Sequence, residues 1–154
     1  KLMEKPELSY RQVPLTDFEI QVPLGWEEES VSREGLTGTA FGYGHLLRDA
    51  AQFIVEFRPL GQANISSENV RMILEASQER MEEQGPKVEW VDAEVPFIRQ
   101  MKMWPSGILT LRLVRVRDGF LQSFYWESIG ESEDKAIFVD PLPVFESIRL
   151  ITKP

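Results

Sequence analysis

The chain has 154 residues, a net charge of −8 and no cysteine, with 42% hydrophobic and 27% charged residues. These values are ordinary for one globular domain that buries a core of its own. The acidic balance argues against a general nucleic-acid binder, because such proteins need basic surface to displace phosphate counterions. The lack of cysteine excludes disulfides, thiolate nucleophiles and cysteine metal sites.

Residues 1–16 are polar and are interrupted by prolines, which predicts a flexible leader before a single domain formed by residues 17–154. A start at Lys1 without methionine fits either a trimmed chain or a mature exported protein that has lost its signal segment. No apolar run approaches the roughly 20 residues that a membrane-spanning helix needs, so we expect no transmembrane segment.

The first predicted strand has an alternating pattern. Phe18, Ile20 and Val22 alternate with polar residues, and the strand is expected to end in a turn at Gly25. We expect the next residue, Trp26, to be structural, with its indole covering one end of the core.

A glycine-rich stretch, residues 38–44, is compatible with a kinked strand or with a turn. It does not have the context of a phosphate-binding loop, because a strand and not a helix follows it. That strand contains Phe53 and Val55 and is expected to end at Pro59.

The clearest helix is predicted over Ser66–Gln84. Ser66 is a suitable N-cap, Ile65 and Val70 are spaced as a hydrophobic staple, and Gly85 with Pro86 ends the pattern. One face carries the apolar and small residues at helical spacing: Val70, Ile73, Leu74, Ser77 and Met81. We expect Ile73 and Leu74 to be buried against a sheet.

The second half reads as a meander followed by a short helix. Strands are expected over residues 88–91, 95–104, 108–116 and 120–126, and Asp118-Gly119 favours a two-residue type I′ hairpin turn. A closing helix would present one apolar face made of Val144, Phe145, Ile148 and Ile151. Short turns between consecutive strands imply antiparallel pairing, so the predicted class is α+β.

This order of elements resembles the PsbP-like superfamily, which includes PsbP itself, the Mog-type Ran-binding proteins and the DcrB-like bacterial lipoproteins. The matching segments are Phe18 to Trp26, the helix Ser66 to Gln84, the hairpin at Asp118-Gly119, and Phe145 to Leu150. The resemblance implies a central antiparallel sheet with helices packed on both faces, an α/β/α sandwich. It also implies a mostly non-enzymatic role as an accessory subunit, lipoprotein or chaperone-like binder, and it transfers no catalytic, metal or cofactor residue.

The residues themselves offer little catalytic chemistry. His45 is the only histidine and lies in a pattern typical of a loop, so neither a catalytic triad nor a zinc site is expected. Acidic clusters occur at residues 27–29, at Asp92 with Glu94, and at Glu131, Glu133 and Asp134. A solvated acidic surface is favoured over a pair of catalytic carboxylates or a calcium loop.

A local excess of positive charge is more suggestive. Between residues 95 and 126 the chain carries five basic residues and one acidic residue, and aromatic residues are interspersed with them. Arginine with exposed tyrosine or tryptophan is typical of protein interfaces. The alternative is a solvated basic edge that discourages aggregation. The candidate partner-binding residues are Arg99, Arg112, Arg115, Tyr125 and Trp126.

Three functions follow as hypotheses. The first is a non-catalytic binding or accessory protein that binds another protein, bacterial and exported, either periplasmic or membrane-anchored. The second is a cytosolic adaptor chaperone for a type VI secretion effector, and the third is a small hydrolase that uses clustered carboxylates. The first two expect a protein partner, no cofactor and no nucleic acid, and a homodimer is compatible with either.

Overall fold

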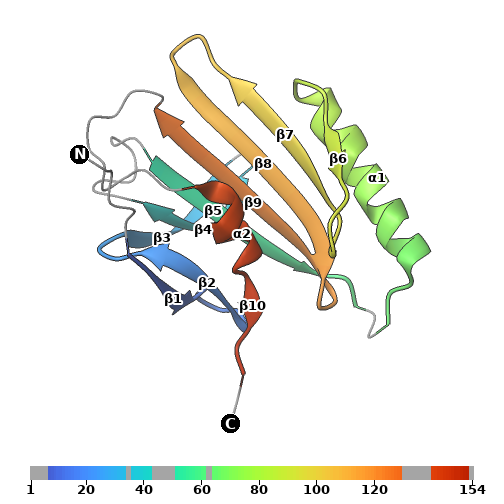
Figure 1. Cartoon of the computed structure of the whole chain (residues 1–154), viewed down its shortest axis with the longest axis horizontal. Coiled ribbons are helices and arrows are strands. Elements are labelled where there is room, and N and C mark those ends of the chain that lie inside the picture. The colour runs from blue at the N-terminus through green and yellow to red at the C-terminus, as the bar shows by residue number, and fades with distance from the viewer. Residues whose placement is uncertain (1–6, 34–35, 43–50, 62–63, 130–139, 153–154) are drawn as a thin grey trace.

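The computed structural model of the chain describes residues 7–33, 36–42, 51–61, 64–129 and 140–152 (Figure 1). Strands and two helices make up the described part. In chain order the elements are β1 (Leu8–Gln12), β2 (Phe18–Pro23), β3 (Glu27–Arg33), β4 (Leu36–Gly42), β5 (Ala51–Pro59), α1 (Ser67–Glu83), β6 (Glu89–Val91), β7 (Phe97–Met103), β8 (Ile108–Arg117), β9 (Phe120–Ile129), α2 (Pro141–Glu146) and β10 (Arg149–Leu150).

Two sheets organise the molecule. The larger has seven strands in the order β3-β4-β5-β9-β8-β7-β6, and the smaller has three in the order β1-β2-β10. Every strand pair is antiparallel. The predicted α+β class is therefore confirmed. Asp118 and Gly119 both adopt positive φ in the β8–β9 turn, as a type I′ turn requires.

Helix α1 lies on one face of the larger sheet. The Oγ of Ser66 accepts a hydrogen bond from the amide of Asn69 at 3.1 Å, which confirms the predicted N-cap. Leu74 is fully buried with Ile98 and Val114 beneath the helix. Ile73 is only half-buried at the margin of this cluster, so the expectation of full burial was wrong for that residue.

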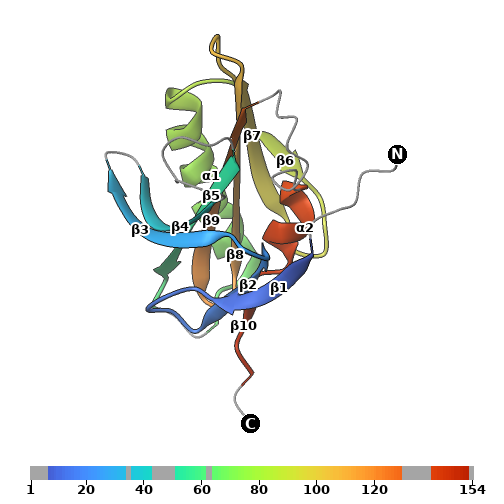
Figure 2. The same cartoon turned by 90° about the vertical axis from the view of Figure 1, so that its left-hand side faces the viewer.

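The main core lies on the opposite face of the larger sheet. There the smaller sheet and α2 cover the strands, and Figure 2 shows α1 and α2 on opposite sides. Trp26 is 3% exposed, and its ring centroid lies 5.9 Å from that of Phe53, which confirms that it packs in the core. Phe145 of α2 contacts Phe97 and Phe124 of the sheet, so α2 is held by an aromatic cluster.

The prediction of a flexible leader over residues 1–16 was wrong for the part that the structure describes. Residues 8–12 form β1, which pairs along β2 from Leu8 opposite Pro23 to Gln12 opposite Glu19. Val13, the next residue, is 1% exposed. The edge of β2 offers unpaired amides and carbonyls, and β1 satisfies them although its own sequence is polar. Residues 1–6 lie outside the described part.

The closing helix is shorter than predicted. It ends at Glu146, and the chain continues through Ser147 into β10, which pairs with β2. The Oγ of Ser147 donates to the carbonyl of Val144 and accepts from the amide of Gln21, so this residue stops the helix and ties it to β2. Ile148 is buried as expected, but it is reached by a turn and not by helical spacing.

The glycine-rich stretch is a strand as far as the structure describes it, up to Gly42. Gly38 has a φ of +140°, and a Cβ atom there would lie 2.1 Å from the carbonyl oxygen of Val55. The hydroxyl of the neighbouring Thr37 bonds the carboxylate of Glu56 on β5. Only glycine allows this close approach of two strands.

Candidate functional site

The five candidate partner residues do not form one surface. Alternation along the strands places Arg112 and Tyr125 on the face that carries α1, and Arg99, Arg115 and Trp126 on the face that carries α2. The prediction that Arg115 and Arg112 lie on opposite faces of β8 is confirmed. A partner could therefore contact only a part of this set at one time.

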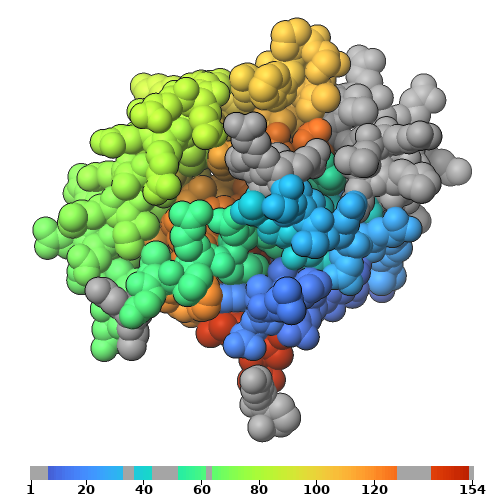
Figure 3. All heavy atoms as spheres, turned by 180° about the vertical axis from the view of Figure 1, so that it is seen from behind, coloured from blue at the N-terminus to red at the C-terminus, as the bar shows by residue number. Residues whose placement is uncertain are grey.

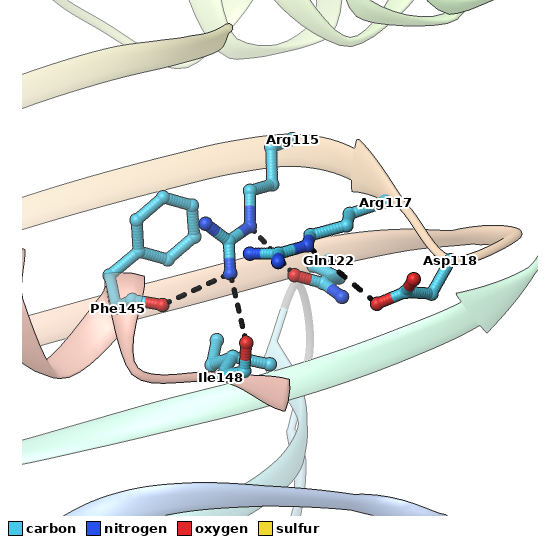
Figure 4. Close-up of polar contacts among 6 residues, drawn as sticks. All are labelled: Arg115, Arg117, Asp118, Gln122, Phe145 and Ile148. Atoms are coloured by element: carbon cyan, nitrogen blue, oxygen red, sulfur yellow. Dashed lines mark hydrogen bonds and ion pairs between the residues drawn. The ribbon is translucent and has the colours of Figure 1, made fainter. Parts of the chain in front are cut away.

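Arg115 is an interior residue. It is 3% exposed, and its Nε donates to the Oε1 of Gln122 at 2.8 Å. Its Nη2 donates to the carbonyls of Phe145 at 3.2 Å and Ile148 at 3.5 Å (Figure 4). Burial, together with the neighbouring charge of Arg117, lowers the pKa of Arg115 to about 10. The expectation that Arg115 is part of an exposed partner surface was wrong, because α2 covers it.

The prediction that Trp126 belongs to an exposed partner surface was also wrong. It is 9% exposed and belongs to the main core with Phe53 and Trp26. The Nε1 atoms of both tryptophans have no hydrogen-bond partner among the described residues. Arg99 is accessible, but its Nη2 bonds the carboxylate of Glu89 at 2.6 Å, an internal pairing at the sheet edge.

Arg112 and Tyr125 instead line a groove of about 300 Å³ beside α1. Helix α1 packs mainly on β7 and β8, and the groove lies beside it over the same face of β9 and β5. Seen from behind, β8–β9 show in orange between the yellow-green helix and the green-to-blue strands (Figure 3). Ser77, Arg80 and Met81 of α1, together with its C-cap Gln84, form one wall of the groove.

The strand register fixes the floor of the groove as three rows. Tyr125 pairs with Ile54 on one side and with Arg112 on the other. Ser123 pairs with Glu56 and Val114 in the second row, and the third row contains Leu121, Arg58 and Val116. Strand spacing places the first and third rows about 13 Å apart along the strands.

The groove is basic although the protein is acidic. Its lining includes three arginines and one carboxylate, that of Glu56. Arg112 donates to the Oε1 of Gln84 at 3.3 Å, and its guanidinium carbon lies 5.4 Å from the centroid of the Tyr125 ring. Both are neutral groups, and among the described residues neither Arg112 nor Arg80 forms an ion pair. Their charges are therefore available to a ligand.

Arg58 differs from the other two arginines of the groove. Its Nη2 lies 3.4 Å from the Oε1 of Glu56, whose other carboxylate oxygen accepts from Thr37. The pair is partly exposed, so the internal attraction is weak.

Sequence reasoning missed Arg58 and Arg80. The sequence did contain a signal for Arg80. It lies between Ser77 and Met81, two buried residues of α1, so it is placed near the face of the helix that meets the sheet. Arg58 had no such signal, because a lone arginine before Pro59 is common at the end of a strand. Their convergence depends on how α1 crosses the sheet, which strand and helix periodicities do not specify.

A second hollow, of about 400 Å³, lies between the first turns of α1 and the β6–β7 connection. Val70, Trp90 and Pro96 give it an apolar lining, and Arg71 and Asp92 supply one charge of each sign. Arg71 is already paired with Glu75 at 3.0 Å. This hollow therefore has no charge excess to indicate a ligand.

The expectations about metal ligands can be compared with the described part of the chain. Within it, no group of three histidine or acidic side chains is placed to hold a metal ion. His45, Glu131, Glu133 and Asp134 lie outside the described residues, so the expectations about them stay predictions. No helix among the described residues is long and apolar enough to span a membrane.

Comparison with protein-family models gives no match, and no curated protein matches the chain. Among solved structures, the chain is similar to the solution structure of cyanobacterial PsbP (CyanoP) from Synechocystis sp. PCC 6803. The identity is 16% over 94% of this chain and 92% of that chain, with a TM-score of 0.48. This likeness extends to neither function nor site residues, and membership of the PsbP-like superfamily, or of any branch of it, stays a prediction.

Proposed function

We propose that this chain is a non-catalytic binding protein that holds a segment of another protein in the groove beside α1. The observation that carries the proposal is the groove between α1 and the sheet, where Arg80 and Arg112 form no ion pair with the described residues. A groove between a helix and a sheet is a concave surface of the kind that takes up ligands. Arginine and tyrosine on such a surface are typical anchors of protein partners.

Site-specific photo-crosslinking tests this proposal. A photoreactive amino acid at Ser123, on the groove floor, is expected to capture a protein from an extract of the producing cells. The same amino acid at Glu79, which is exposed and outside the groove lining, is the matched control. Capture from Glu79 alone, or from neither position, would contradict the proposal. A crosslinked dimer would identify the partner as a second copy of this chain.

The absence of catalysis is part of the proposal and needs its own test. The purified chain is expected to stay at background in a broad screen of ester, glycoside, phosphate and peptide hydrolysis. Activity that co-purifies with the chain and disappears in Glu131→Gln or Asp134→Asn would favour the carboxylate hydrolase instead.

We also propose that the protein is bacterial and works outside the cytoplasm, in the periplasm or attached to a membrane. The support is the resemblance of its order of elements to the DcrB-like lipoproteins. Fractionation of the producing cells with an antibody against the chain tests this location. Recovery in the cytoplasm, together with capture of a secreted effector from Ser123, would favour the adaptor chaperone.

A further inference from the structure

We propose that the groove binds an extended segment of the partner that carries two acidic residues four positions apart, with a non-acidic residue midway between them. This inference rests on the proposed function and specifies the chemistry of the bound segment. Its basis is the distribution of charge along the three rows of the floor and the wall formed by α1.

The first acidic residue would meet the row of Arg112 and Tyr125, and Arg80 lies on the α1 wall of the same groove. The guanidinium of Arg112 already bonds Gln84 and packs near the Tyr125 ring, so its orientation is fixed before any ligand arrives. A carboxylate can replace water on the remaining N–H groups of Arg112 and on Arg80. Hydrogen bonds between a guanidinium and a carboxylate are among the strongest in proteins.

The second acidic residue would meet Arg58 in the third row. Arg58 shares the carboxylate of Glu56 with the hydroxyl of Thr37, and the Arg58–Glu56 contact is long at 3.4 Å. A ligand carboxylate would therefore find N–H groups on Arg58 that Glu56 leaves unused. The side chain of Arg58 is 57% exposed, so a ligand can reach it.

The distance between the two ends selects an extended segment. The first and third rows are about 13 Å apart, the length of four residues in an extended chain. In an α-helix, residues four positions apart are only about 6 Å from each other, too close to reach both ends. The same distance is too great for one small carboxylate or phosphate to bridge.

Glu56 selects against an acidic residue in the middle of the segment. It lies in the second row beside Ser123, between the two basic ends. Its carboxylate accepts a hydrogen bond from Thr37, so a ligand carboxylate above it would meet a like charge. Glu127 lies one row beyond Tyr125 on the same face of β9. Its negative charge disfavours a further acidic residue of the ligand beyond the row of Arg112 and Tyr125.

Synthetic pentapeptides provide the probe. The capped peptide Glu-Ala-Ser-Ala-Glu is expected to shift amide resonances of the full chain in β5, β9 and the last turns of α1. The glutamine version, Gln-Ala-Ser-Ala-Gln, is expected to bind at least about fivefold more weakly, because both charge-assisted contacts are lost. Glu-Ala-Glu-Ala-Glu is expected to bind no better than the first peptide despite its additional charge.

Matched arginine variants connect the binding to the groove. The double variant Arg80→Gln/Arg112→Gln is expected to weaken binding of Glu-Ala-Ser-Ala-Glu about tenfold. Arg71→Gln and Arg99→Gln each remove one accessible arginine outside the groove and should stay within about twofold of the wild type. The melting temperature of each variant shows whether the fold is retained. If the double variant unfolds, Arg80→Gln alone, on the exposed helix surface, is used for the same comparison.

Equal affinity for the glutamate and glutamine peptides would overturn the inference, and so would unchanged binding in the groove variant. The same shifts with glutarate, at similar concentration, would show a site for free anions and also overturn it. If Ser123 captures a partner whose crosslinked segment is not acidic, the inference fails while the proposed function stands. If Ser123 captures nothing, the proposed function itself fails.

Discussion

The guanidinium of Arg115 contacts Phe145 in two ways. Its Nη2 donates to the carbonyl oxygen of Phe145 at 3.2 Å, and its central carbon lies 4.4 Å from the centroid of the Phe145 ring. One buried cation thus contacts both the backbone and the side chain of Phe145, close to the end of α2. It does so without a carboxylate partner among the described residues.

Arg115→Ala is expected to lower the free energy of unfolding by about 2–4 kcal/mol, because the carbonyl of Phe145 and the amide of Gln122 lose a buried donor. Arg117→Ala is the matched control on the same face of β8, where Arg117 is exposed and its Nε lies 3.7 Å from the carboxylate of Asp118. The control should lose less than about 1 kcal/mol. Urea unfolding measures both, and equal losses would mean that Arg115 does not hold α2.

Arg115 is also expected to make the unfolding free energy depend on pH in a defined direction. Burial lowers the pKa of Arg115 to about 10 in the native state, below its value in the unfolded chain. Above pH 10 the unfolded state therefore binds more protons, so this residue raises the stability of the wild type as the pH increases. The difference in unfolding free energy between the wild type and Arg115→Met should stay constant from about pH 6 to 9 and grow above about pH 10. A difference that shrinks there would contradict the direction of the shift.

Leu74→Ala should lower the unfolding free energy by about 2–5 kcal/mol, since Leu74 is fully buried between α1 and the sheet. Met72→Ala lies two residues earlier on the same helix but is 62% exposed, so it should lose less than about 0.5 kcal/mol. Urea melts of the two variants measure the difference. A small loss for Leu74→Ala would show that α1 does not pack as described.

Gly38→Ala should lower the unfolding free energy by more than about 2 kcal/mol, because the new Cβ atom would collide with the carbonyl of Val55. Gly61→Ala separates this collision from backbone strain alone. Gly61 also has positive φ, but its Cβ would meet nothing within 4 Å, so about 1 kcal/mol is expected. Thermal melts measure both, and similar losses would mean that close strand approach is not the reason for glycine at position 38.

Trp26→Ala should lower the unfolding free energy by about 3–5 kcal/mol. Trp26 is buried against Phe53, whereas Trp90, the matched control, is 40% exposed and donates a hydrogen bond to the side-chain amide oxygen of Gln78. Trp90→Ala should lose less than about 1.5 kcal/mol. If Trp26→Ala kept its stability but lost binding in the crosslinking experiment, the structural role of Trp26 would be wrong.

Local patterns in the sequence predicted most of the elements. The periodicity around Leu74 identified α1, and the turn at Asp118-Gly119 identified the β8–β9 hairpin. Both signals depend on residues close together in the sequence, so they can be recognised without knowing how the rest of the chain folds. β1 gave almost no signal, because its residues form a strand only when β2 offers an edge to pair with.

The candidate site was predicted only in part. Alternation along β8 correctly separated Arg112 from Arg115, but it could not tell which face a short helix would cover. That depends on α2, which packs its Phe145 over Arg115 from a distant part of the sequence. Arg58 and Arg80 were not among the predicted residues, because their place in the groove depends on how α1 crosses the sheet.

The position of β2 between β1 and β10 bears on how the chain is made. The ion pair between Glu19 and Arg149 joins residues 130 positions apart, so β2 gains this neighbour only after nearly all of the described chain has been synthesised. Until then Phe18, Ile20 and Val22 lack the α2 and β10 segments that help to enclose them. The pairing of β10 with β2 is thus expected to form late during translation, and the nascent chain would expose part of an apolar strand until the α2–β10 segment emerges.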